Sequence, residues 1–326
     1  MESLIMNNGF IYSLLLTGPN VGQSLTAEQI AQWQPADGLL WLHLRYREPK
    51  ARKWILNSGL QRVEMDTLLA TDTRPRVLSS DKGILLALRG VNLNPNSDPE
   101  DMVAVRIYAE EHKIISTCER QLQSVIDVAD AITQGKGPVD SAAFIMAICE
   151  RLTQRKVEFI GKLEEQLDEL EERVVTQVNK TLRTDIAELR RQTVVLRRYL
   201  APQREAFSRM LQEASELFDD NDKVRLREIH ETLIRVIEDL DAIRDRASVT
   251  QEELQSQQSE QVNQRLYFLS LISAVFLPLG FLTGLLGVNI GGIPGAESNW
   301  AFAAFCGGLF ALIGLQMYLF YRLKWL

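Results

Sequence analysis

Hydrophobic and polar positions follow one pattern up to about residue 140, where short apolar runs alternate with polar turns. The runs cover residues 10–16, 38–44, 83–93, 102–109 and 112–118. Runs of this length between turn residues predict β-strands. Thr26 followed by Gln29 is typical of a helix start, and the turn-rich residues 94–101 indicate a hairpin between the third and fourth runs. Residues 1–140 are therefore predicted to form a mixed α/β domain.

A second pattern, typical of long helices, covers residues 141–265. This region has almost no glycine and a single proline, Pro202, among dense Glu, Gln, Leu and Arg. We expect one helix from residue 143 to about 179, and a second from 184 to 214 that is bent or interrupted near Pro202. A third helix is expected to begin after the acidic turn at residues 219–222.

Apolar residues of the third helix recur every seven positions. One row holds Leu226, Leu233, Leu240, Ala247 and Leu254, with Ile229, Val236 and Ile243 between them. This spacing predicts a packed helical seam and is consistent with assembly of several copies. Farther on, the inward positions become polar at Gln257, Gln261 and Gln264, and no Gly or Pro interrupts residues 223–275. We expect one helix that enters the membrane at Leu266; the alternative is a polar linker between a soluble domain and its anchor.

Two apolar runs near the end of the chain predict a membrane hairpin over residues 266–326. Residues 266–286 form a run of 21 without a charge, about 31 Å of helix, which is enough to span a bilayer. A second run covers residues 300–321. Arg265, Arg322 and Lys324 flank the spans, whereas the loop 287–299 carries only Glu297. The positive-inside rule then places both termini in the cytoplasm, and the first residues do not resemble a signal peptide.

One face of the first span is suited to an ion path. It carries Asn263, Leu266, Ser270, Ser273, Leu277, Gly280 and Gly284, spaced three and four apart and leading to Gly287. Leu266 and Leu277 would be apolar constrictions of a water-filled path; the alternative is that the small residues only allow close helix packing. Because two helices cannot enclose a pore, several copies would have to assemble around an axis.

Two further features of the spans give expectations about packing. Pro278 in mid-span is tolerated if a neighbour satisfies the carbonyl that it frees. In the second span, small residues recur along one stripe, and we expect this stripe to pack against the first span. The stripe consists of Ala301, Ala304, Gly308 and Ala311.

Charge and scattered side chains exclude several other functions. The formal net charge of −7 argues against nucleic acid as a partner. The three cysteines and three histidines are far apart, so no structural zinc spacing is present. We find no Ser/His/Asp arrangement and no phosphate loop; Gly135 to Pro138 is better interpreted as a linker. We therefore expect no enzyme and no cofactor, and we interpret Trp33, Trp41 and Trp54 as packing residues.

The stretch PLGFLTGLLGVN, followed by a short acidic loop, a second span and the ending RLKWL, resembles the CorA-type divalent cation transporters. The hallmark of that family is Gly-Met-Asn at the end of the first of two C-terminal spans. Here Val288 replaces the Met, and Gly-Val-Asn with the loop 290–295 is similar to the ZntB zinc transporter branch. The resemblance implies an α+β cytoplasmic domain, long α-helices and a two-helix transmembrane hairpin. It also implies a funnel-shaped homopentamer in the bacterial inner membrane, in contact with lipid.

The resemblance implies Zn2+ transport, with uptake coupled to protons by symport. A ring of Asn289 amides behind Gly287 and Val288 would hold the waters of a hydrated cation, and Glu297 would attract cations. The span offers zinc no nitrogen or sulfur ligand, so we expect Co2+, Ni2+ and Cd2+ to compete, and we assign no metal-ligating residue. The alternatives are a CorA-like Mg2+/Co2+ channel, zinc efflux, or, in a different class, a membrane-anchored scaffold or sensor.

Overall fold

The structure is a computed structural model that describes residues 9–80, 82–176, 181–213, 217–288, 295 and 298–323. It divides into two compact units, Met1–Gln251 and Glu252–Leu326, which we call the N-terminal and C-terminal units. The predicted three-part division, at residues 140 and 265, stays a prediction.

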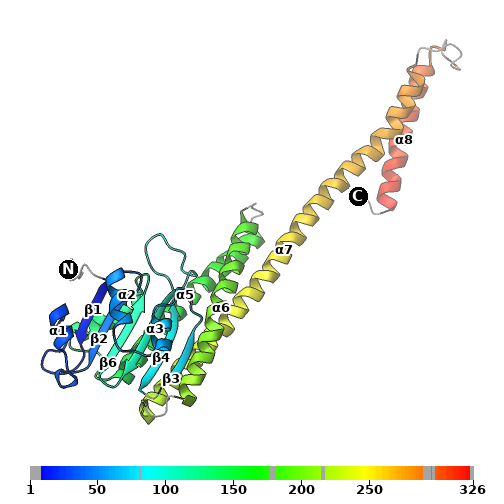
Figure 1. Cartoon of the computed structure of the whole chain (residues 1–326). Helices are drawn as coiled ribbons and strands as arrows, with labels where there is room; N and C mark the ends of the chain where they lie inside the picture. The colour runs from blue at the N-terminus through cyan, green and yellow to red at the C-terminus, as the bar shows by residue number, and fades with distance from the viewer. Residues whose placement is uncertain are drawn as a thin grey trace. The chain divides into compact units, whose positions relative to one another are not determined.

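A six-stranded sheet forms the centre of the N-terminal unit (Figure 1). The strands lie in the order β1-β2-β6-β5-β4-β3. Only β2 and β6 pair in parallel; the other neighbours are antiparallel. The strands are β1 Phe10–Leu15, β2 Leu40–Arg45, β3 Arg76–Ser80, β4 Gly83–Gly90, β5 Val103–Glu110 and β6 Lys113–Cys118.

Helices cover both faces of this sheet, which explains why its strands are continuous apolar runs. On one face, Leu44, Leu85 and Ile115 share a buried cluster with Ile55 of α2 and Leu68 of α3. Elsewhere α5 packs against β4, α6 packs against β3 and β4, and α4 packs against α5. The bounds of the shorter helices are α1 Ala27–Gln32, η1 Pro35–Asp37, α2 Pro49–Leu56, α3 Arg62–Leu68 and α4 Gln123–Thr133.

The structure confirms the five predicted strands and the hairpin between β4 and β5. It also confirms the helix start, because Thr26 caps α1 and exchanges hydrogen bonds with Gln29 in a capping box. Trp41 is fully buried, and Trp33 and Trp54 are partly buried against apolar clusters. The strand β3 was not predicted. Of its five residues only Val77 is buried, so its sequence carries no apolar run.

Three long helices follow, as the composition of residues 141–265 predicts. They are α5 Ser141–Thr176, α6 Leu182–Glu213 and α7 Asp220–Leu286. The expected interruption of α6 at Pro202 is not observed. Burial on both sides of the proline holds the helix: Leu200 and Phe207 are in the core, and the side chain of Gln203 accepts a hydrogen bond from the backbone N–H of Arg89 in β4 at 2.9 Å.

The seven-residue seam of α7 packs inside the chain. Leu226, Leu233, Leu240 and Ala247 are each 1% exposed or less. Ion pairs beside the seam join α7 to its neighbours, from Arg225 to Glu150 of α5 at 2.8 Å and from Arg197 of α6 to Asp241 at 2.8 Å. The seam is therefore packed within the chain, so by itself it is no evidence for assembly of several copies, which stays a prediction. The prediction of a helix uninterrupted through residues 223–275 is confirmed.

Candidate ion pathway

Two helices of the described chain are long and apolar enough to cross a membrane. One is α7, through its uncharged residues 266–286; the other is α8, Ala301–Arg322. In the C-terminal unit α8 lies alongside the last part of α7 (Figure 1). The end of α7 at Leu286 matches the end of the first predicted span, and α8 lies within one residue of the second. Where the first span begins along α7 stays a prediction.

One face of α7 is partly covered, and it is the face that meets α8. A hydrogen bond marks the contact: the side-chain amide Nε2 of Gln316 donates to the backbone oxygen of Ala274 at 3.2 Å. Sequence reasoning did not single out Gln316, although it is the only amide or charged residue within residues 300–321. The partly covered positions of α7 in this stretch are Leu271, Ala274, Val275, Pro278, Leu279 and Leu282.

The predicted pore-lining row occupies a different face of the same helix. At about 100° per residue, the centre of this row lies roughly 150° around the helix from the face that meets α8. Leu266 is 56% and Leu277 is 72% exposed. Within the described unit the row is therefore open to whatever surrounds the hairpin: lipid, another subunit or a water-filled path. All of Asn263, Leu266, Ser270, Ser273, Leu277, Gly280 and Gly284 are exposed.

Several small residues of the two spans are not used for close packing within the described chain. A Cβ added at Gly280, Gly284 or Gly308 would meet no atom within 4 Å. In α8, Ala304, Gly308 and Ala311 are all exposed. The expectation that the stripe of small residues packs against the first span is therefore wrong for these three. The partly covered face of α8 carries larger side chains instead, among them Phe305, Leu309, Ile313 and Gln316.

The hydroxyl of Ser273 shows what the row can offer a cation. Its Oγ donates to the backbone oxygen of Leu269 at 2.9 Å, so the hydroxyl proton is used in a hydrogen bond within the helix. The hydroxyl oxygen keeps its acceptor capacity. A hydrated cation presents water hydrogens outward, and acceptor groups on an exposed face are suited to hold such water.

The helix α7 ends at the motif that carries the family resemblance. The N–H of Gly287 donates to the backbone oxygen of Thr283 at 2.9 Å, continuing the helical hydrogen bonding by one residue. A Cβ at Gly287 would lie 2.8 Å from that same oxygen, so glycine suits this close turn. Val288 is 44% exposed. Asn289 and Glu297 lie outside the described residues.

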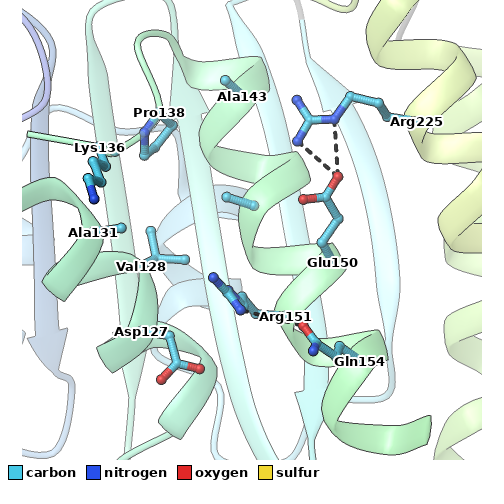
Figure 2. A pocket seen from close by; sticks show the side chains of 12 residues that line it. Asp127, Val128, Ala131, Lys136, Pro138, Ala143, Glu150, Arg151, Gln154 and Arg225 are labelled. Atoms are coloured by element: carbon cyan, nitrogen blue, oxygen red, sulfur yellow. Dashed lines mark hydrogen bonds and ion pairs between the residues drawn. The ribbon is translucent and has the colours of Figure 1, made fainter.

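The N-terminal unit has a separate cavity of about 490 Å³ beside α4 and α5 (Figure 2). The predicted linker residues Lys136 and Pro138 line one side of it, between the two helices. Arg225 of α7 faces the cavity but is engaged by Glu150 at 2.8 Å, as the dashed lines show. Asp127 is engaged by Arg155. The charges at this cavity thus mostly serve to join helices to one another.

Metal-ligating side chains do not gather in the described part of the chain, where no three His, Cys, Asp or Glu residues could hold a metal ion together. The buried His43 has a structural role instead. Its Nδ1 lies 2.7 Å from the Oγ of Ser116, which also accepts a hydrogen bond from Trp41. Burial, with a smaller effect of Arg45, lowers the pKa of His43 to about 3. The imidazole is therefore neutral at physiological pH.

Comparison with known proteins identifies the family to which the chain belongs. Residues 36–322 match the family described as CorA-like Mg2+ transporter protein. The chain is 38% identical over 318 residues to the zinc transport protein ZntB of Yersinia enterocolitica, covering 97% of this chain and 96% of that protein. It is also 38% identical over 327 residues to the divalent cation transporter CmaX of Pseudomonas aeruginosa, covering 98% and 97%.

A solved structure of full-length CmaX has the same fold as this chain. The two superpose with a TM-score of 0.84 at 36% identity, and the match covers 98% of each chain. The likeness therefore includes the sheet, the long helices and both apolar helices. The family match and these relatives agree over almost the whole length, and the chain belongs to the CorA-like Mg2+ transporter family.

Proposed function

We propose that the chain transports Zn2+ across the bacterial inner membrane, as a homopentamer with both termini in the cytoplasm. The observation that carries the proposal is the 38% identity to a protein named for zinc transport, over 97% of this chain. The length of this match matters, because the matched region includes both spans and the Gly-Val-Asn motif. The exposed row on α7 supports the proposal, since five such rows around an axis would line one path.

In the proposed path the ion keeps much of its water. The row has neither His nor Cys, the ligands that zinc favours. Hydroxyl and amide oxygens can instead hold coordinated water, and Asn289 would do so at the outer mouth. This mode distinguishes poorly among divalent cations of similar size, so Co2+, Ni2+ and Cd2+ are expected to compete with Zn2+.

We further propose uptake coupled to protons in symport. The row carries no titratable side chain, so we place the groups that bind the proton away from the row, outside the bilayer. Glu297 of the outer loop and carboxylates of the N-terminal unit are the candidates. The direction of transport follows from the proton gradient, which points inward across a bacterial inner membrane.

A second candidate function is transport of divalent cations with no preference for zinc. Two observations favour it: the family description names Mg2+, and CmaX, at equal identity, is named a divalent cation transporter. Competition flux decides between the two functions. An excess of Mg2+ should leave zinc entry nearly unchanged if zinc is preferred, and should suppress it if the protein is a general divalent cation transporter.

The role of Asn289 is tested in liposomes that contain the purified protein and a zinc-sensitive dye. A ring of subunits loses one amide per subunit in Asn289→Ala, so zinc entry should fall by roughly tenfold or more. Asn299→Ala makes the same chemical change elsewhere in the outer segment and should leave entry within about twofold of wild type. Equal flux in wild type and Asn289→Ala would remove Asn289 from the proposal.

A further inference from the structure

Pro278 leaves a backbone carbonyl without its usual partner in the middle of α7. A proline has no N–H, so the oxygen four residues earlier, that of Ala274, cannot receive the hydrogen bond that continues an α-helix. In a bilayer no water is available to replace that donor, and an unsatisfied carbonyl costs on the order of several kcal/mol. The helix α7 nevertheless runs through Pro278 to Leu286.

The missing donor comes from the other span. The side chain of Gln316 in α8 donates from Nε2 to the oxygen of Ala274 at 3.2 Å. This is the carbonyl that Pro278 frees, and both Ala274 and Pro278 lie on the partly covered face of α7. Because a carbonyl can only accept, the group of Gln316 that faces it must be the NH2.

The other half of the glutamine amide supports a dedicated role. Its Oε1 is buried and has no hydrogen-bond partner among the described residues. A buried unpaired acceptor is unfavourable, so the side chain does not take this orientation to satisfy its own oxygen. Donation to Ala274 is the interaction that the orientation achieves.

We infer that Gln316 is a positioning residue for transport, because it supplies the hydrogen bond that Pro278 removes and so holds α8 against one face of α7. With that face fixed, the row through Ser273 and Leu277 is turned away from α8. The part of this inference that concerns transport rests on the proposed function. The hydrogen bond itself concerns the stability of the hairpin.

A double-mutant cycle on the full-length protein tests the inference. Gln316→Met removes the amide at nearly constant volume. Pro278→Ala restores the backbone N–H, so the carbonyl of Ala274 no longer needs a donor from α8. Native protein remaining after heating in detergent is measured by size-exclusion chromatography, and zinc entry is measured in liposomes. Tyr318→Phe is the control, since it removes a polar group from a side chain of α8 that is 59% exposed.

We expect Gln316→Met to speed thermal loss of native protein about fivefold or more, the equivalent of roughly 1 kcal/mol, and to slow zinc entry by a similar factor. In the Pro278→Ala background the same substitution should change both by less than about twofold. Tyr318→Phe should behave as wild type in both backgrounds. Equal effects of Gln316→Met in the two backgrounds, or no effect in either, would overturn the inference.

Two outcomes separate this inference from the proposed function. Suppose that Gln316→Met speeds the loss of native protein less in the Pro278→Ala background than in wild type, but no variant shows zinc entry. This result would support the hydrogen bond and contradict zinc transport. If wild type admits zinc but Gln316→Met has the same effect in both backgrounds in both assays, zinc transport is supported and the role of Gln316 is contradicted. If Gln316→Met yields no folded protein, recovery of folded protein in the double variant supports the inference, and continued failure overturns it.

Discussion

The buried lysine Lys156 gives a prediction whose size follows from the structure. It lies on α5, is 1% exposed, and its Nζ has no hydrogen-bond partner among the described residues. Burial lowers its pKa from 10.5 to about 7, opposed by the thiol of Cys149. Lys156→Met keeps the aliphatic length and removes the amine, so we expect the protein to become more stable.

The sign and the pH window follow from the two pKa values. The unfolded lysine binds a proton up to about pH 10.5, whereas the folded one releases it above about pH 7. The cost of burying the amine is therefore complete below pH 7 and disappears as the pH rises toward 10.5. At about 1.4 kcal/mol per pH unit the upper limit is about 5 kcal/mol. Because local opening limits the real cost, we expect about 2–3 kcal/mol near pH 7, or roughly 5–10 °C in Tm.

Thermal unfolding of the full-length protein in detergent, followed by circular dichroism from pH 6 to 10, measures this effect. The gain in Tm for Lys156→Met over wild type should be largest at pH 6–7 and should shrink steadily toward pH 10. Lys162→Met is the matched control, since Lys162 is an exposed residue of the same helix, and its effect should stay within about 0.5 kcal/mol. A variant less stable than wild type at every pH, or a gain independent of pH, would refute the reasoning.

Three further predictions concern the row, a helix contact and a loop. If Leu277 is a constriction, Leu277→Ala should raise zinc entry into liposomes by about twofold or more. Phe276 is exposed and lies off the row, so Phe276→Ala should leave zinc entry unchanged. Equal effects of the two substitutions would contradict the assignment of Leu277. Arg246 of α7 makes two hydrogen bonds of 2.6 Å to carboxylates of α5. Arg246→Met should therefore lower the free energy of unfolding by about 1 kcal/mol at low salt and by less at high salt. Thermal unfolding at the two salt concentrations measures the difference. Gly38 and Gly59 both have positive φ, 119° and 75°, but of the two only Gly38 would place a Cβ 2.2 Å from a backbone oxygen. In urea unfolding, the free energy of unfolding should fall by about 1 kcal/mol in Gly59→Ala and by at least about 3 kcal/mol in Gly38→Ala.

The sequence predicted elements well where burial is continuous. Apart from β3, the strands of the sheet are apolar on both faces, so they are visible as runs. The long helices are visible because glycine and proline are nearly absent. The strand β3 was missed because only Val77 among its residues is buried. The interruption considered at Pro202 does not occur, because local preference is outweighed by burial of Leu200 and Phe207 on either side. A bend at Pro202 stays a prediction.

Contacts between elements were harder to predict than the elements. The seam of α7 has the spacing of an oligomer interface, but the same spacing fits any helix packed on two neighbours, and α5 and α6 occupy it. The small residues of α8 indicated close packing, whereas the actual contact uses larger side chains and the amide of Gln316. A signal was present in the sequence: Pro278 requires a donor, and Gln316 is the only amide that the second run contains.

The central claim is that this chain moves zinc, and zinc entry into liposomes with and without a pH gradient tests it most directly. With the outside acidic, we predict that zinc entry accelerates, that the lumen acidifies as zinc enters, and that excess Mg2+ slows entry little. Zinc movement no faster than in protein-free liposomes, under either condition, would contradict the account.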